Sequence, residues 1–199
     1  MGCGCEMEAN NELERKTLRI VLFINVLMFF IEFIFGLIAQ STGVVADSLD
    51  MFADASVYAI SLYVVGRSLL LQTKAAKLSG AIQILLAVFV LFEVIHRFVV
   101  GSEPISMMII ILGSLALMAN TISLVLINKH RDAGVHMQAS LIFSKNDVIA
   151  NIGIILSGVL VWLLDSHYPD LIIGFIISMI VLRGGIQILR VADKDQVVN

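Results

Sequence analysis

Charged residues are scarce in this chain. Only 15% of its 199 residues are Asp, Glu, Lys or Arg, whereas 59% are hydrophobic. A soluble domain has roughly 25% charged and 45–50% apolar residues. The composition therefore predicts an integral membrane protein. The sequence also lacks a basic face and any basic run interleaved with aromatic residues, which argues against nucleic acid as a partner.

Cysteine and proline are equally rare. The two cysteines, Cys3 and Cys5, both lie in the first few residues, so no disulfide framework is indicated. The two prolines, Pro104 and Pro169, stand near the expected starts of hydrophobic segments, where a missing N–H group does not weaken a helix. The N-terminus is acidic and polar, unlike a cleavable signal peptide, which begins with a basic region.

Long hydrophobic runs dominate the rest of the sequence. A helix needs about 20 mostly apolar residues to cross a hydrocarbon core of ~30 Å. Such runs predict six transmembrane helices, at residues 17–39, 44–71, 76–99, 105–127, 137–164 and 171–189. The expected fold is an all-α, six-transmembrane-helix bundle. We expect a cytoplasmic N-terminal tail (1–16), a transmembrane domain (17–191) and a short cytoplasmic tail (192–199), without a C-terminal cytoplasmic domain.

Basic residues gather on one side of the predicted bundle. Of the loops on the other side, only one has a basic residue nearby, Arg97. Cytoplasmic loops carry an excess of Lys and Arg. We therefore expect both termini in the cytoplasm, in a plasma or inner membrane. The residues that carry this bias are Arg15, Lys16, Arg19, Arg67, Lys74, Lys77, Lys129, Arg131, Arg190 and Lys194.

Three aspartates interrupt the second predicted span: Asp47, Asp50 and Asp54. A carboxylate at the bilayer centre costs roughly 2.5–3.5 kcal/mol on insertion scales, so chains retain one mainly where it faces a partner, a cavity or an ion path. At 100° per residue the three fall within a stripe about 60° wide. Asp50 and Asp54 are also i, i+4 neighbours, and two ionised carboxylates so close require either a proton or a cation.

The fifth predicted span carries a second polar seam. Asp147 lies about ten residues, or roughly 15 Å, from its cytoplasmic end. Asp50 and Asp54 lie about as deep from the opposite side, so the three carboxylates can meet near mid-membrane as a divalent-cation site. The alternative is a protonated acid in an interhelical hydrogen bond. The seam consists of His136, Ser140, Ser144, Asp147 and Asn151.

Other polar residues admit two interpretations each. Asp47 is either part of the ion site or a span-start residue favoured by the helix dipole. Histidines 130 and 136 are either surface residues or entry ligands at the cytoplasmic mouth. The remaining polar residues of the spans either line the interior or connect neighbouring helices. They are Asn25, Glu32, Glu93 and Asn120.

The N-terminal Cys3-Gly4-Cys5 segment also has two interpretations. Two nearby thiolates beside Glu6 could capture a soft or borderline metal ion in the cytosol. The alternative is a disordered tail with two incidental cysteines. Lipidation is less consistent with the sequence, because Glu6 stands where the myristoylation pattern requires Ser or Thr.

Several segments resemble one known family. The segment IEFIFGLIAQSTGVVADSLDMFADA is similar to the first-to-second span signature of the cation diffusion facilitators, which export divalent metals. The resemblance continues through FEVIHRFVVGSEPIS, MANTISLVLINKH and PDLIIGFIISMIVLRGGIQILR, and covers almost all of residues 17–192. It implies a bundle of the cation efflux type.

The resemblance also implies a ligand set. Asp50 and Asp54 occupy the two second-span ligand positions, and Asp147 occupies one of the fifth-span pair. The other fifth-span position, usually His or Asp, is Phe143 here. Three carboxylates without histidine are harder ligands, which weakens the argument for zinc as the sole substrate. Candidates to complete the coordination sphere are Asn151, Asn146, Asp47 and water. Asn151 ranks first because it lies one turn beyond Asp147 on the same side.

The function implied is export of a divalent transition metal of the Zn, Cd, Co, Fe and Mn class against an inward flow of protons, usually by a homodimer. The substrates are then protons and a metal ion, which is Zn²⁺ or a similar cation. The protein itself lies in the lipid bilayer. No resident cofactor and no enzymatic activity are expected. Two alternatives stay open: a non-transporting metal-binding or partner-stabilising subunit, and a proton-coupled transporter of another cation.

Overall fold

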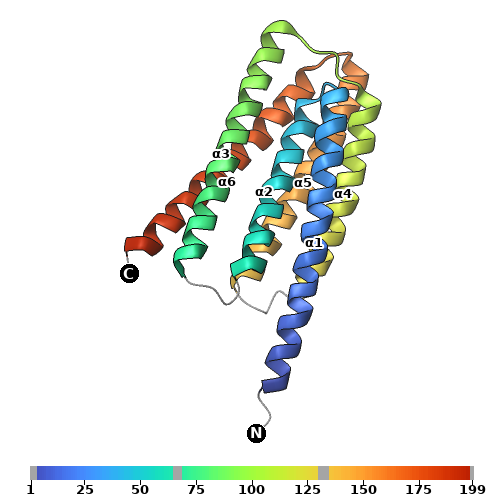
Figure 1. Ribbon diagram of the computed structural model, residues 1–199. Helices are drawn as coiled ribbons and strands as arrows, with labels where there is room; N and C mark the ends of the chain where they lie inside the picture. Colours follow the sequence, from blue (N-terminus) through green and yellow to red (C-terminus); the bar gives the residue numbers. More distant parts are fainter. Residues whose placement is uncertain (1–3, 65–68, 130–134, 198–199) are drawn as a thin grey trace.

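The computed structural model describes residues 4–64, 69–129 and 135–197, although side chains next to these gaps and near both termini lie outside the description. The described chain forms six helices, which confirms the all-α prediction (Figure 1). They are α1 (Gly4–Ile38), α2 (Thr42–Val64), α3 (Leu69–Val100), α4 (Ser106–Asn128), α5 (Val135–Leu164) and α6 (Tyr168–Val197).

Five helices in the described residues contain a stretch long and apolar enough to cross a membrane. These stretches are Arg15–Ile38, Gly80–Val100, Ser106–Asn128, Ser144–Leu164 and Tyr168–Arg190. Helix α2 is not among them, because Asp47, Asp50 and Asp54 all lie in it. It nevertheless runs beside α1 within the bundle, and its crossing of the membrane stays a prediction (Figure 1).

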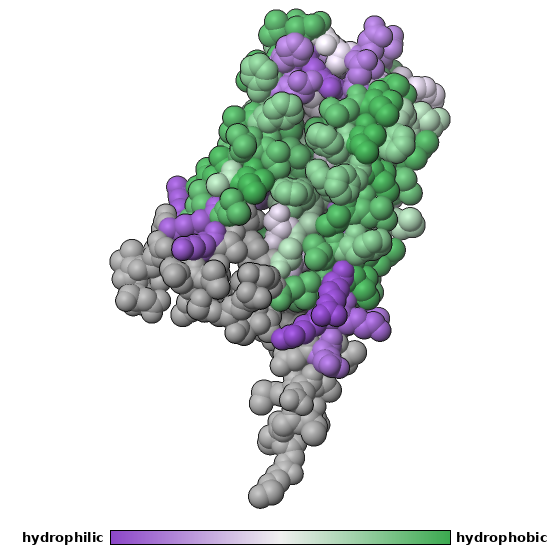
Figure 2. All heavy atoms as spheres, in the orientation of Figure 1, coloured by the Kyte–Doolittle hydropathy of each residue, from purple (hydrophilic) through white to green (hydrophobic). Residues whose placement is uncertain are grey.

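The outer surface of the bundle is apolar. Figure 2 shows a broad hydrophobic band over the helices, with hydrophilic residues gathered toward its two ends. Large hydrophobic side chains such as Phe23, Phe92 and Trp162 are 66–70% exposed. Water would not stabilise such a surface, whereas lipid does. The structure therefore supports an integral membrane protein.

Helix ends differ from the predicted span ends. Helix α1 already begins at Gly4, and α6 continues to Val197, so both helices extend into the predicted tails. Hydropathy marks where apolar residues stop, whereas a helix continues for as long as its backbone and polar side chains favour it. The prediction that the second span reaches residue 71 is wrong, because α2 ends at Val64 and α3 begins at Leu69.

The six helices do not pack equally closely on one another. The closest-packed pairs are α3 with α6, α1 with α2, and α4 with α5. Where α3 meets α6, a Cβ atom at Gly80 would lie 3.0 Å from the backbone oxygen of Gly185, so small residues allow the two backbones to approach. Helix α2 also packs on α6 and α3, but it approaches α5 and α4 at few positions.

Asp170 connects α6 to the start of α2. Its buried carboxylate accepts hydrogen bonds from the backbone N–H of Thr42 at 2.6 Å and of Gly43 at 3.2 Å, and from both the Ser41 and Thr42 hydroxyl groups. The first N–H groups of a helix have no partner within that helix. Asp170 therefore acts as an N-cap supplied by a different helix. Gly174 permits this contact, because a Cβ atom there would lie 2.8 Å from Thr42 atoms.

Replacing Asp170 should destabilise the bundle. Asp170→Ala leaves buried donors at the start of α2 without an acceptor, so we expect a loss of roughly 2–3 kcal/mol in unfolding free energy. Thermal unfolding of the purified protein in detergent, followed by circular dichroism, measures the change. Glu103→Ala, at an exposed side chain in the α3–α4 loop, should leave the melting temperature unchanged. Equal melting temperatures for the two variants would contradict the capping role.

Candidate metal site

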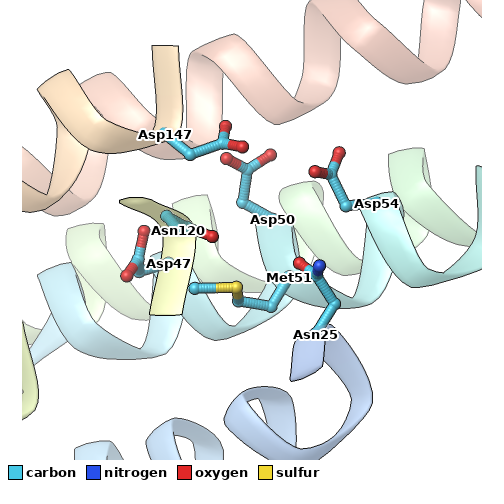
Figure 3. Close-up of a pocket in the computed structure, with 7 residues that line it drawn as sticks. All are labelled: Asn25, Asp47, Asp50, Met51, Asp54, Asn120 and Asp147. Carbon is cyan, nitrogen blue, oxygen red and sulfur yellow. The ribbon is translucent and has the colours of Figure 1, made fainter. Parts of the chain in front are cut away.

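A narrow pocket lies between helices α1, α2, α4 and α5. The lining side chains come from all four helices, and acidic residues predominate among them (Figure 3). They are Asn25 from α1, Asp47, Asp50, Met51 and Asp54 from α2, Asn120 from α4, and Asp147 from α5.

Asp50, Asp54 and Asp147 point toward one another in this pocket (Figure 3). Asp147 lies close enough to Asp50 and Asp54, and also to Asp47, for electrostatic interaction. The Tyr58 hydroxyl, at 3.5 Å, is directed at Asp54. Among the described residues, no three His, Cys, Asp or Glu side chains converge closely enough to enclose a metal ion as they stand. The acids therefore share a pocket without forming a finished coordination sphere.

Asp47 belongs to a separate hydrogen-bond chain. The Asn151 amide nitrogen donates to both Asp47 carboxylate oxygens, at 2.8 and 3.0 Å, and the Asn120 amide nitrogen donates to the Asn151 amide oxygen at 3.0 Å. All three side chains are buried. The chain links α2, α5 and α4 in the interior. Asp47 is therefore a partnered interior acid and not an exposed residue at the start of a span.

The two asparagines proposed to complete the coordination sphere lie elsewhere. Asn151 is engaged with Asp47 and Asn120 and does not line the pocket. Asn146 is exposed on the outside of α5. Helical phase placed Asn151 on the same side as Asp147, but the 40° that separates four residues is enough to turn it toward α4.

Two other acids have contrasting surroundings. Glu93 accepts a hydrogen bond of 2.7 Å from Arg97, one turn along the same helix, so its partner does not come from a neighbouring helix. Glu32 is fully buried, and neither of its carboxylate oxygens has a donor within the described part of the chain. Asp47 and Asp50 both lie close enough to Glu32 to interact with it electrostatically.

Several sequence-based candidates lie outside the described residues. They include Cys3 and His130 as whole residues, and the side chains of Cys5, His136 and Phe143. The capture site at the N-terminus and the effect of Phe143 therefore stay predictions. In contrast, Met51 was overlooked by sequence reasoning although it lines the pocket. Its helical phase, 40° from that of Asp47, is the signal that could have identified it.

Comparison with known proteins identifies the family. Residues 18–193 match the family model of the cation efflux transmembrane domain. The chain therefore belongs to the cation efflux family, the cation diffusion facilitators, as the sequence motifs predicted. At the level of the family, its members are transporters of divalent metal cations and not enzymes.

Two curated relatives are zinc transporters. The chain is 23% identical over 188 residues to the zinc transporter ZitB of Yersinia pseudotuberculosis serotype I (strain IP32953), and equally to that of Yersinia pestis. The alignment covers 88% of this chain but 60% of each relative. The chain thus spans about three fifths of the length of the relatives that it matches.

Replacing Asn151 should lower the stability of the bundle more than it lowers the affinity for metal. Asn151→Ala leaves the Asp47 carboxylate and the Asn120 amide unpaired inside the bundle, so we expect a loss of roughly 2 kcal/mol in unfolding free energy. Metal affinity, measured by isothermal titration calorimetry, should change by less than threefold. Asn146→Ala, on the exposed face of the same helix, is the matched control. A large loss of affinity with unchanged stability would instead make Asn151 a ligand.

Proposed function

We propose that this protein exports a divalent transition-metal cation in exchange for protons, through the pocket between α1, α2, α4 and α5. The observation that carries the proposal is the meeting of Asp50, Asp54 and Asp147 from two helices inside an apolar bundle. Without a counter-charge, such an arrangement is unfavourable in a membrane. Membership of the cation efflux family makes a metal cation the appropriate counter-charge.

The carboxylates also explain how protons would be coupled to the metal. Three negative charges repel one another in nonpolar surroundings, so each acid must be neutralised by a proton or shared with a cation. Metal and protons therefore compete for the same oxygen atoms. A bundle that opens alternately to the two sides would bind metal on one side and protons on the other. A bound cation would draw the three carboxylates closer to one another.

The proposed topology has six spans with both termini in the cytoplasm of a plasma or inner membrane. It includes α2 as a span and keeps tails 1–16 and 192–199 outside the membrane domain 17–191. Figure 1 supports it, because α1 begins and α6 ends toward the same end of the bundle. Exposed Arg15, Lys16 and Arg19 also lie toward that end of α1. A homodimer is part of the proposal by family resemblance.

Transport by purified protein tests the proposal. Proteoliposomes loaded with a fluorescent metal indicator and a pH dye should show metal influx together with proton efflux when Zn²⁺, Mn²⁺, Co²⁺, Fe²⁺ or Cd²⁺ is added outside. Asp54→Ala removes one of the three pocket carboxylates, so both signals should fall to those of protein-free liposomes.

The control for this experiment is Glu103→Ala, whose side chain is exposed and distant in sequence from the pocket residues. It should transport like the unmodified protein. Metal binding without flux in folded protein would favour the non-transporting subunit. Proton flux that no metal affects would favour a transporter of another cation.

A further inference from the structure

Asn25 places an amide oxygen without a partner against the acidic pocket. Its side chain is 1% exposed, and its Oδ1 atom has no hydrogen-bond donor among the described residues. It lines the same pocket as Asp50, Asp54 and Asp147. Figure 3 shows its amide group extending from α1 toward α2, between Met51 and Asp54.

The orientation of this amide group is set by its nitrogen. The Asn25 Nδ2 atom donates a hydrogen bond of 2.9 Å to the backbone oxygen of Val21, one turn earlier on α1. Rotating the amide by 180° would place two acceptor oxygens against each other and lose this bond. Oδ1 is therefore the atom left facing away from α1.

The other two buried asparagines differ in this respect. Asn120 and Asn151 are hydrogen-bonded to each other, and Asn151 also donates to Asp47. Among the described buried asparagines, Asn25 is the one whose oxygen is both fully enclosed and without a donor. A buried polar group without a partner is unfavourable, and proteins retain one mainly where it has a functional role or binds an ion. The pocket acids only accept hydrogen bonds when ionised and donate one when protonated, so the Asn25 oxygen needs either a protonated acid or a cation as its partner.

We propose that the Asn25 Oδ1 atom is a ligand of the transported cation and completes an all-oxygen site with Asp50, Asp54 and Asp147. The inference rests on the proposed metal site and adds a preference of that site for harder cations. Carboxylate and carbonyl oxygens suit harder cations such as Mn²⁺, whereas zinc sites usually contain His nitrogen or Cys sulfur. The Met51 thioether does not alter this choice, because Met51 packs in a hydrophobic cluster with Met28, Ala116 and Ala119.

Metal titration of the purified protein in detergent tests the inference. Asn25→Leu removes the amide at similar volume, and Asn25→Asp keeps an oxygen at the same place. We expect Asn25→Leu to weaken Mn²⁺ binding at least tenfold and Zn²⁺ binding less, whereas Asn25→Asp keeps Mn²⁺ affinity. Asn128→Leu, at an exposed asparagine at the end of α4, should change neither. Calorimetry with each metal salt gives the affinities.

Thermal unfolding separates a ligand from a structural residue. Because the Asn25 oxygen has no donor within the described part of the chain, Asn25→Leu should melt no lower than the unmodified protein in chelator, and lose most of the stabilisation that added Mn²⁺ provides. A lower melting temperature in chelator, with an unchanged Mn²⁺ shift, would overturn the inference. Asn25→Ser supplies a second test if the leucine variant does not fold, since it also removes the amide oxygen.

The two proposals fail in different ways. If the unmodified protein binds no metal, or Asp54→Ala binds as well as it does, the proposed metal site is wrong. If Asp54→Ala abolishes binding but Asn25→Leu matches Asn128→Leu, the site stands and Asn25 is not a ligand. Zinc bound more tightly than manganese by the unmodified protein, with the same preference in Asn25→Leu, would overturn the selectivity.

Discussion

The high cost of an unpaired polar group in a nonpolar bundle organises this structure. Helix α2 carries three carboxylates into the interior, and each needs a proton, a hydrogen-bond donor or a cation. Asp47 obtains two hydrogen bonds from the Asn151 amide group. Asp50 and Asp54 instead face Asp147 across the pocket. One helix therefore supplies both a structural connection and two acids of the proposed metal site.

Hydrogen bonding also distinguishes structural residues from candidate functional residues elsewhere in the bundle. Asp170 is buried as deeply as Asp47, but its oxygens accept hydrogen bonds from Ser41, Thr42 and Gly43, so it fixes α6 to α2. Asn25 is equally buried, yet its oxygen has no donor among the described residues. Burial alone does not identify a functional residue in this bundle. The state of its hydrogen bonds is more informative, because a satisfied group contributes to folding, whereas an unsatisfied one still lacks a stabilising partner.

The helices and the acidic residues of the pocket were predictable from the sequence for different reasons. Apolar runs identified the hydrophobic segments, but they could not locate the ends of α1 and α6, which continue into polar residues. Helical phase placed Asp50, Asp54 and Asp147 on facing seams, because a period of 3.6 residues fixes direction along one helix. It could not show that Asn151 would meet Asp47, since that depends on how α2, α4 and α5 are rotated against one another.

The packing of α2 links these polar contacts to movement. At one end, Asp170 fixes its first turn to α6, and close packing joins it to α1. Toward α5, which carries Asp147, it has few close approaches. The pocket carboxylates thus come from two helices that approach each other closely at few positions and are joined by the hydrogen bonds from Asn151 to Asp47. A cation that attracts all three acids would act on a boundary where α2 and α5 approach each other at few positions, so it could alter their spacing while the closely packed α1–α2 and α4–α5 pairs stay intact.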